Sequence, residues 1–178
     1  GRYVDILSFL EHYRRFKSGD NLKPVIMLAP SPPDDNTWKK LSRYPEVYFV
    51  QGISTESADL GRAGALTADN VIILSEGQEK ADDLSVDARP IMTFRLVKGG
   101  RAFPFIDLAH FPSCQFLGAL DTEKYMDIGY NPYYAAGQVF ASSNLNTLLI
   151  QVFYNKHVVK IFEHLVDGWV FAQKITDK

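Results

Sequence analysis

The chain of 178 residues is long enough to bury a substantial core as one domain, since 46% of its residues are hydrophobic. Its formal net charge of −2 gives no basic field for nucleic acid, and its single cysteine, Cys114, gives no disulfide framework. No apolar run approaches the roughly 18–20 residues that a membrane-spanning helix needs, and no signal peptide is visible. We therefore expect a soluble domain from a reducing compartment.

The first part of the chain alternates helical and strand patterns. Apolar residues recur with helical spacing over residues 3–16 and predict an amphipathic helix. Residues 24–29 form a continuous apolar run, which is typical of a strand buried on both faces of a parallel sheet, and residues 46–50 predict the next strand. Between them we expect a helix around residues 38–44, capped by Asp35 or Asn36.

Residues 50–76, VQGISTESADLGRAGALTADNVIILSE, predict a strand that turns at Gly52, a short helix, and a second strand at 71–75. A nucleotide-binding unit would carry G-x-G-x-x-G directly after its first strand, and the chain contains no such motif. Gly61 and Gly64 are better explained by close packing of the short helix on the sheet. This stretch therefore argues against a nucleotide cradle.

The middle of the chain contains three shorter patterns. Residues 88–97 fit either a strand or a helix; Pro90 near the start and Gly99 after the end favour the helix. Residues 103–108, FPFIDL, and 113–117, SCQFL, each predict a short strand.

Residues 133–154 and 158–166 predict two helices, which are joined at Asn155 and Lys156. Their apolar stripes fit core packing, or alternatively an assembly surface, because they are broader than two helices can bury between themselves. The assembly residues would be Phe140, Leu145, Leu148, Leu149, Val152, Phe153, Val158, Ile161, Phe162 and Leu165.

Several motifs occur in a characteristic order. Ala58-Asp59-Leu60 and VIIL are followed by FPFIDL and by the segment Gln115-Phe116-Leu117, then by PYYAAGQVF and a helical turn at Tyr154-Asn155. In this order they resemble the RCK (regulator of K⁺ conductance) domain, which is related to the KTN domains of bacterial potassium uptake systems. The resemblance covers nearly the whole chain and is closest to the second RCK domain of Slo-type calcium-activated potassium channels.

The resemblance implies an α/β fold with a Rossmann-like parallel sheet over residues 1–130, its first strand expected outside the fragment, and a helix-turn-helix assembly subdomain over residues 131–178. It also implies a ligand-sensing domain on the cytoplasmic side of a membrane. Its partners would be other RCK domains of the same and neighbouring subunits of a tetrameric channel, together forming a gating ring. An isolated fragment is then expected to dimerise.

The resemblance also places a calcium-binding loop after Gln115-Phe116-Leu117. The corresponding loop, GALDTEKYMD, offers Asp121, Glu123 and Asp127 as metal ligands, with Lys124 among them. Calcium requires about six to eight oxygen ligands, so these three carboxylates would need backbone or neighbouring groups to complete a site. A solvated loop whose acids cap helices accounts for the same residues.

No catalytic constellation is found. The chain lacks G-x-S-x-G, H-E-x-x-H and C-x-x-C motifs, and His110 with Cys114 does not make a zinc site. We therefore predict a regulatory domain without turnover. The alternatives are an NAD(P)-binding Rossmann oxidoreductase or nucleotide sensor, and a peripheral KTN-type subunit of a potassium transporter.

Overall fold

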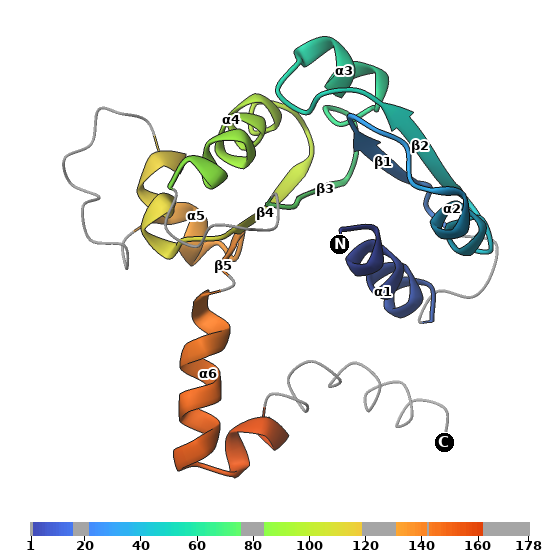
Figure 1. The fold of residues 1–178 in the computed structure, drawn as a ribbon. Helices are drawn as coiled ribbons and strands as arrows, with labels where there is room; N and C mark the ends of the chain where they lie inside the picture. Colours follow the sequence, from blue (N-terminus) through green and yellow to red (C-terminus); the bar gives the residue numbers. More distant parts are fainter. Residues whose placement is uncertain (1, 16–21, 76–83, 119–130, 142, 162–178) are drawn as a thin grey trace, which may run out of the picture.

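The computed structural model describes residues 2–15, 22–75, 84–118, 131–141 and 143–161, and over these residues the chain folds as an α/β structure (Figure 1). The strands are β1 (Val25–Ala29), β2 (Val47–Gln51), β3 (Asn70–Ile73), β4 (Phe103–Leu108) and β5 (Val139–Ala141). The helices are α1 (Arg2–Arg15), α2 (Asp35–Leu41), α3 (Ser57–Arg62), α4 (Ala88–Val97), α5 (Pro132–Ala135) and α6 (Ser143–Tyr154), with 3-10 helices η1 (Leu84–Asp87) and η2 (Phe111–Leu117).

The strands form two parallel groups. β1 pairs with β2, in the register Val25 opposite Val47. β4 lies between β3 and β5, with Ile73 and Val139 both opposite Ile106. The expected parallel α/β architecture with flanking helices is therefore confirmed.

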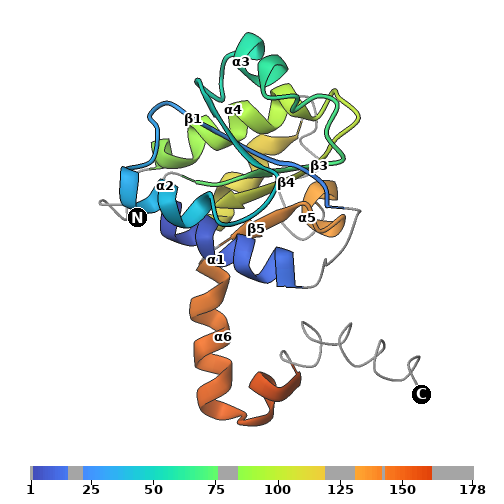
Figure 2. The same ribbon diagram turned by 90° about the vertical axis from the view of Figure 1, so that its right-hand side faces the viewer.

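Helices cover both faces of the strands. Leu10 of α1 and Leu41 of α2 pack with Met27 of β1 in one cluster. The next residue of β1, Leu28, packs instead against a cluster that contains Leu60 of α3 and Val97 of α4. Because successive strand residues point to opposite faces, α1 and α2 lie on one face and α3 and α4 on the other (Figure 2).

The main core lies under α4. Phe94, which is fully buried, packs with Ile106 and Leu108 of β4 and with Cys114 and Leu117 of η2. The helical interpretation of residues 88–97 is confirmed, because one side of α4 supplies this core. α6 follows β5 and projects away from the sheets (Figures 1 and 2), and residues 157–161 begin a second helix after the predicted break at Asn155.

Three sequence expectations are wrong. The expected strand at 113–117 belongs to the 3-10 helix η2, whose residues Cys114 and Leu117 are buried three positions apart. The cap of α2 is Asp34, whose carboxylate accepts the Thr37 N–H at 3.2 Å, rather than Asp35 or Asn36. The helical pattern expected from residue 133 is interrupted by β5, which the pairing with β4 selects.

Candidate functional site

The carboxyl ends of β1 and β2 form the edge where parallel α/β sheets usually bind ligands. At this edge β2 ends at Gln51, and Gly52 starts the loop that leads into α3. The polar groups of this loop decide whether a nucleotide phosphate could bind there.

Gly52 is required because the carboxylate of Asp59 lies against it. A Cβ atom at residue 52 would come within 2.7 Å of Asp59 Oδ2 and 2.8 Å of its Cγ. In that position Oδ2 accepts the N–H of Ile53 at 2.7 Å. The glycine therefore makes room for a side chain of the protein itself rather than for a bound ligand.

Gly61 and Gly64 have different roles from the expected close packing. A Cβ at Gly61 would meet no atom within 4 Å, so the expectation of a tight contact there is wrong. Gly64 lies just after the end of α3 and has φ +71°, in the left-handed region that glycine adopts without strain.

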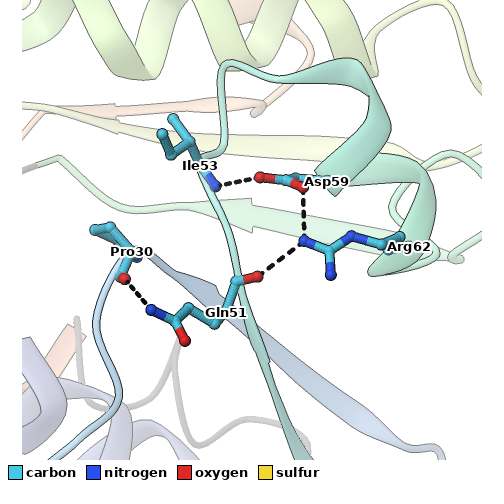
Figure 3. A network of polar contacts seen from close by, with 5 residues as sticks. All are labelled: Pro30, Gln51, Ile53, Asp59 and Arg62. Atoms are coloured by element: carbon cyan, nitrogen blue, oxygen red, sulfur yellow. Dashed lines mark hydrogen bonds and ion pairs between the residues drawn. The ribbon is translucent and has the colours of Figure 1, made fainter.

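A short polar network extends from Asp59 across the strand ends (Figure 3). Arg62 Nη2 donates to Asp59 Oδ1 at 2.6 Å and to the carbonyl oxygen of Gln51 at 3.0 Å. The Gln51 side chain in turn donates from Nε2 to the carbonyl oxygen of Pro30, just after β1, at 3.0 Å. The network thus joins the ends of both strands to α3.

This network opposes anion binding. The Ile53 N–H bond, followed by the Arg62 contact, holds the pKa of Asp59 below its usual value, so the carboxylate is charged at neutral pH. Its negative charge lies where a nucleotide phosphate would need backbone donors, and one of those donors is already bonded to it. The network therefore stabilises the loop that leads from β2 into α3.

A second polar group lies near the carboxyl end of β4. Asp87 is fully buried, and its carboxylate accepts the N–H groups of Ala109 at 2.8 Å and His110 at 3.0 Å. Burial, and secondarily the charge of Asp87, raises the pKa of Asp107, while a hydrogen bond from Ser75 opposes the shift. Asp87 thus fixes the turn that follows β4.

The residues that the structure describes contain neither a cluster of metal-binding side chains nor a reactive thiol. No group of three or more His, Cys, Asp or Glu side chains among them is arranged to hold a metal ion. Burial raises the pKa of the Cys114 thiol to about 11, so it stays protonated at neutral pH. The predicted calcium ligands Asp121, Glu123 and Asp127 lie outside the described residues.

The residues that flank this acidic segment are held by hydrogen bonds to the core. On one side Arg95 Nη2 of α4 donates to the carbonyl oxygens of Phe116 at 2.7 Å and Gly118 at 3.2 Å. On the other side Asn131, which is buried, donates from Nδ2 to the carbonyl oxygen of Cys114 at 2.8 Å and caps α5. Sequence reasoning missed both residues, although an Asn directly before Pro132 is a recognisable helix cap.

An exposed apolar surface lies on α6 and the helix after it. Leu149, Phe153 and Tyr154 are 69%, 82% and 83% exposed. We call hairpin surface the set Leu149, Ile150, Phe153, Tyr154, Val159 and Ile161, all of them exposed.

The hairpin surface only partly coincides with the predicted assembly residues. Leu149, Phe153 and Ile161 are exposed as an assembly surface requires, Phe140 is 39% exposed, and Val152 and Val158 are half-buried. The side chains of Leu145 and Leu148, and the whole of Phe162 and Leu165, lie outside what the structure describes. The prediction missed Ile150, Tyr154 and Val159, which lie beside the predicted stripe.

The turn between the two helices is built by Asn155. Its N–H donates to the carbonyl oxygen of Gln151 at 2.8 Å, and its side-chain Oδ1 accepts the N–H of His157 at 3.0 Å. Asn155 therefore ends α6 and caps the following helix. Among the described residues, no helix is both long and apolar enough to cross a membrane.

Comparisons with known proteins agree on one family. Potassium channel subfamily T member 1 from Homo sapiens is 24% identical to this chain over 207 aligned positions, which take in 99% of this chain and 16% of the human protein. The proteins of the same name from Mus musculus and Gallus gallus are also 24% identical, over 16% and 17% of their lengths. The chain thus spans about one sixth of the length of these relatives.

A solved structure shares the fold. The structure of the human SLO3 gating ring superposes on 83% of this chain and 27% of that chain, with a TM-score of 0.66 and 23% identity. The family model described as calcium-activated potassium channel slowpoke-like RCK domain matches residues 2–116, which is more than half of the sequence. The chain therefore belongs to the slowpoke-like RCK domains of calcium-activated potassium channels, a family of regulatory rather than enzymatic domains.

Proposed function

We propose that this chain is a cytosolic, ligand-sensing regulatory domain of a potassium channel, which assembles with other RCK domains of the same and neighbouring subunits into a gating ring. The observation that carries the proposal is the hairpin surface. Family membership and the likeness to a gating-ring structure support it.

The hairpin surface has the chemistry of an interface core. It presents two aromatic rings, Phe153 and Tyr154, packed edge to face at 5.4 Å, together with branched aliphatic side chains. Aromatic side chains are enriched at interfaces, whose buried cores are more apolar than their rims, and burying apolar area is favourable by about 25 cal/mol per Å². The partner that fits is the equivalent hairpin of another RCK domain.

The mechanism is linkage between ligand binding and the arrangement of the ring. A ligand that binds the open arrangement more tightly than the closed one shifts the equilibrium by its differential affinity and by no more. In this proposal the polar network around Asp59 and the turn held by Asp87 hold the α/β body together. Movements would then occur between domains rather than within the sheets.

The acidic segment supplies the ligand site in this proposal. Asp121, Glu123 and Asp127 would contribute hard oxygen ligands for Ca²⁺, completed by backbone or partner-subunit oxygens. If they bind Ca²⁺ in the folded state, Ca²⁺ must raise the melting temperature of the chain, and replacing all three with Ala must abolish the increase. If millimolar Ca²⁺ does not change the melting temperature of the wild-type chain, the metal site is no longer part of the proposal.

Electrical recording of the full-length protein tests the regulatory function. In inside-out patches we expect Ca²⁺ steps to change K⁺ current, and we expect the double change Leu149→Asp and Phe153→Asp to abolish that response. The matched control is Gln151→Asp, which adds a carboxylate to the same exposed helix outside the hairpin surface. Unaltered Ca²⁺ sensitivity in the double variant would contradict the proposal, as would micromolar NAD(P)H binding with dehydrogenase activity.

A further inference from the structure

The loop between β1 and α2 lies at the same strand edge as the Asp59 network, and the proposed function gives it no role. It contains Ser31, followed by the two prolines Pro32 and Pro33. Ser31 is the only serine or threonine of the 178-residue sequence that directly precedes a proline. One Ser-Pro pair thus stands at the edge where ligands and enzymes usually reach a parallel sheet.

The loop is presented at the surface. Pro30, Ser31 and Pro32 are exposed, and Pro33 is half-buried. The chain bends at Pro30 and Ser31 and then continues without helix or strand until α2 begins. An enzyme that modifies serine side chains can therefore reach Ser31 in the folded protein.

The prolines determine the conformation of the loop after Ser31. A proline ring fixes φ at about −65°, and a residue that precedes a proline is pushed out of the helical region. Asp34, at the end of the loop, has φ −63° and ψ 158°, close to the polyproline II values of about −75° and +145°. The stretch after Ser31 is therefore extended, which is the form in which many partners bind short peptide segments.

Hydrogen bonds hold both ends of the loop. At its start, Gln51 Nε2 donates to the carbonyl oxygen of Pro30 at 3.0 Å (Figure 3). At its end, the carboxylate of Asp34 accepts the Thr37 N–H at 3.2 Å and caps α2. Because the ends are already fixed, a partner that binds the exposed middle of the loop has few backbone torsions left to order, which lowers the entropic cost of binding.

Two kinds of partner recognise a segment of this composition. Domains that bind polyproline helices would read the spacing Pro30-x-x-Pro33 in an aromatic-lined groove. Kinases that require proline after the modified residue would read Ser31-Pro32, since a proline leaves no N–H for the active site to satisfy. Ligands of polyproline grooves are commonly oriented by a flanking cation, and residues 24–38 contain no Lys or Arg. The loop therefore fits the kinase better.

We propose that Ser31 is a phosphorylation site for a proline-directed serine/threonine kinase. In the transfer, the hydroxyl oxygen of Ser31 attacks the γ-phosphorus of ATP, and the bond between this phosphorus and the β–γ bridging oxygen breaks. The hydroxyl proton passes to a base of the kinase, and the products are phosphoserine and ADP. The inference rests on the cytosolic location in the proposed function, because ATP and these kinases are found there.

Phosphorylation changes the charge of this strand edge. A phosphoserine carries about −1.5 to −2 charges at neutral pH, and it joins the exposed carboxylates of Asp34 and Asp35. The same edge holds the cation Arg62, which donates to the carbonyl oxygen of Gln51. The modification therefore makes the edge more acidic and gives the domain a covalent input that is separate from the Ca²⁺ ligands proposed above.

Phosphorylation of the folded full-length protein in vitro tests the site. The protein is incubated with ATP and, separately, with a purified cyclin-dependent kinase and a purified mitogen-activated kinase, and mass spectrometry quantifies the phosphate on Ser31. We expect one or both kinases to modify Ser31, and Pro32→Ala to slow the reaction by roughly tenfold or more. Ser31→Thr should still be modified, because it keeps a hydroxyl before the proline. The matched control is Pro33→Ala, which removes the polyproline spacing, keeps Ser31-Pro32 and should react as the wild type does.

Three results overturn the inference. They are the absence of phosphate on Ser31 with both kinases, a reaction that Pro32→Ala leaves unchanged, and a reaction that occurs only after urea has unfolded the protein. A polyproline-binding domain that binds the wild type but not Pro33→Ala, without phosphate on Ser31, would assign the loop to the other kind of partner. Electrical recording tests the channel function by a separate readout, so the phosphorylation site and the proposed function can fail independently.

Discussion

At the scale of single residues, Gly52 shows how a glycine after a strand can leave room for a carboxylate of the protein itself, where a nucleotide-binding unit would leave room for a ligand. The pattern of strand, glycine and short helix is shared with nucleotide-binding units, and sequence alone identifies the glycine. The contact between Gly52 and Asp59 spans the loop, and only the folded chain reveals it. Two predictions concern this scale.

The first prediction is that Gly52→Ala destabilises the protein. The added Cβ would lie 2.7 Å from Asp59 Oδ2, so the carboxylate must move and lose the Ile53 N–H. We expect the free energy of unfolding in urea to fall by about 1–3 kcal/mol.

Gly61→Ala is the matched control for this change. It lies inside α3 with no atom within 4 Å of the new Cβ, and should stabilise the protein by about 0.5–1 kcal/mol. Equal effects of the two changes would contradict the role of Gly52. In the double variant with Asp59→Ala, the effect of Gly52→Ala should shrink, because the clash is gone.

The second prediction concerns the pH dependence of Asp107. Burial raises its folded-state pKa above the unfolded value, so the folded protein favours the protonated form. Below the ordinary pKa near 3.8, Asp107 is protonated in both the folded and the unfolded protein and has no unfavourable effect. As pH rises from there through the raised pKa, the buried side chain must ionise, and the free energy of unfolding falls. Asp107→Asn should raise the free energy of unfolding at neutral pH and lose this advantage in acid.

Asp69 provides the comparison of opposite sign. Its pKa is lowered by the hydrogen bond and charge of Lys23, so its carboxylate stabilises the fold above the ordinary pKa and loses that effect as pH falls through the lowered value. Asp69→Asn should therefore reduce stability at neutral pH. Urea titrations at several pH values measure both differences; a gain for Asp107→Asn that does not change with pH would show that charge is not its cause.

At the scale of elements, the sequence predicts most strands and helices, and its errors have physical causes. Clear apolar patterns, such as the periodic one of α1 and the continuous one of β1, are found as expected. The five-residue run SCQFL is ambiguous, because a short apolar run fits a strand or a buried turn of helix equally. The three residues of β5 are too few to show a period, and only pairing with β4 makes them a strand.

The candidate site is less predictable than the fold. The absence of a nucleotide fingerprint can be read from the sequence alone, since this motif depends on residues close together along the chain. It could not reveal that Asp87 holds the backbone after β4 or that Arg95 reaches Gly118, because these contacts join distant segments. The shared exposed face of Leu149 and Phe153 could be predicted, because helical spacing alone places them on one stripe.

The third prediction concerns the cap of α2. Asp34 accepts hydrogen bonds from the backbone and hydroxyl of Thr37, so Asp34→Ala should lower the free energy of unfolding by about 0.5–2 kcal/mol. Asn36→Ala, one of the caps expected from sequence, should change it little, because Asn36 lies within the helix and is exposed. Thermal unfolding followed by circular dichroism distinguishes the two, and a larger effect at Asn36 would reassign the cap.

At the scale of the whole molecule, we expect the exposed hairpin surface to determine association. The fourth prediction is that residues 1–178 self-associate, as a two-fold dimer that pairs the hairpin surfaces of two copies. Leu149→Asp with Phe153→Asp should give a monomer, because each carboxylate would be desolvated in the interface. Sedimentation velocity over a hundredfold concentration range measures the association.

The control for association is Gln151→Asp, which should leave the dimer intact. Both variants should keep the helical signal of the wild type, since the core under α4 does not include these positions. A wild-type chain that sediments as a monomer at high concentration, or a double variant that unfolds instead of dissociating, would assign the hairpin to the core.

The hydrogen bonds of Arg95 and Asn131 have a mechanical consequence for the segment between Gly118 and Asn131. Both of its ends are hydrogen-bonded to the body of the protein. Folding therefore already meets the entropic cost of bringing these ends together, which for n residues grows only as about (3/2)RT ln n. In the proposed function, a cation bound between these anchors would therefore pull on fixed points instead of closing a free loop. One anchor is carried by α4 and the other directly precedes α5, β5 and α6, so in the proposed gating ring a pull between the anchors would reach the hairpin that we propose as the interface.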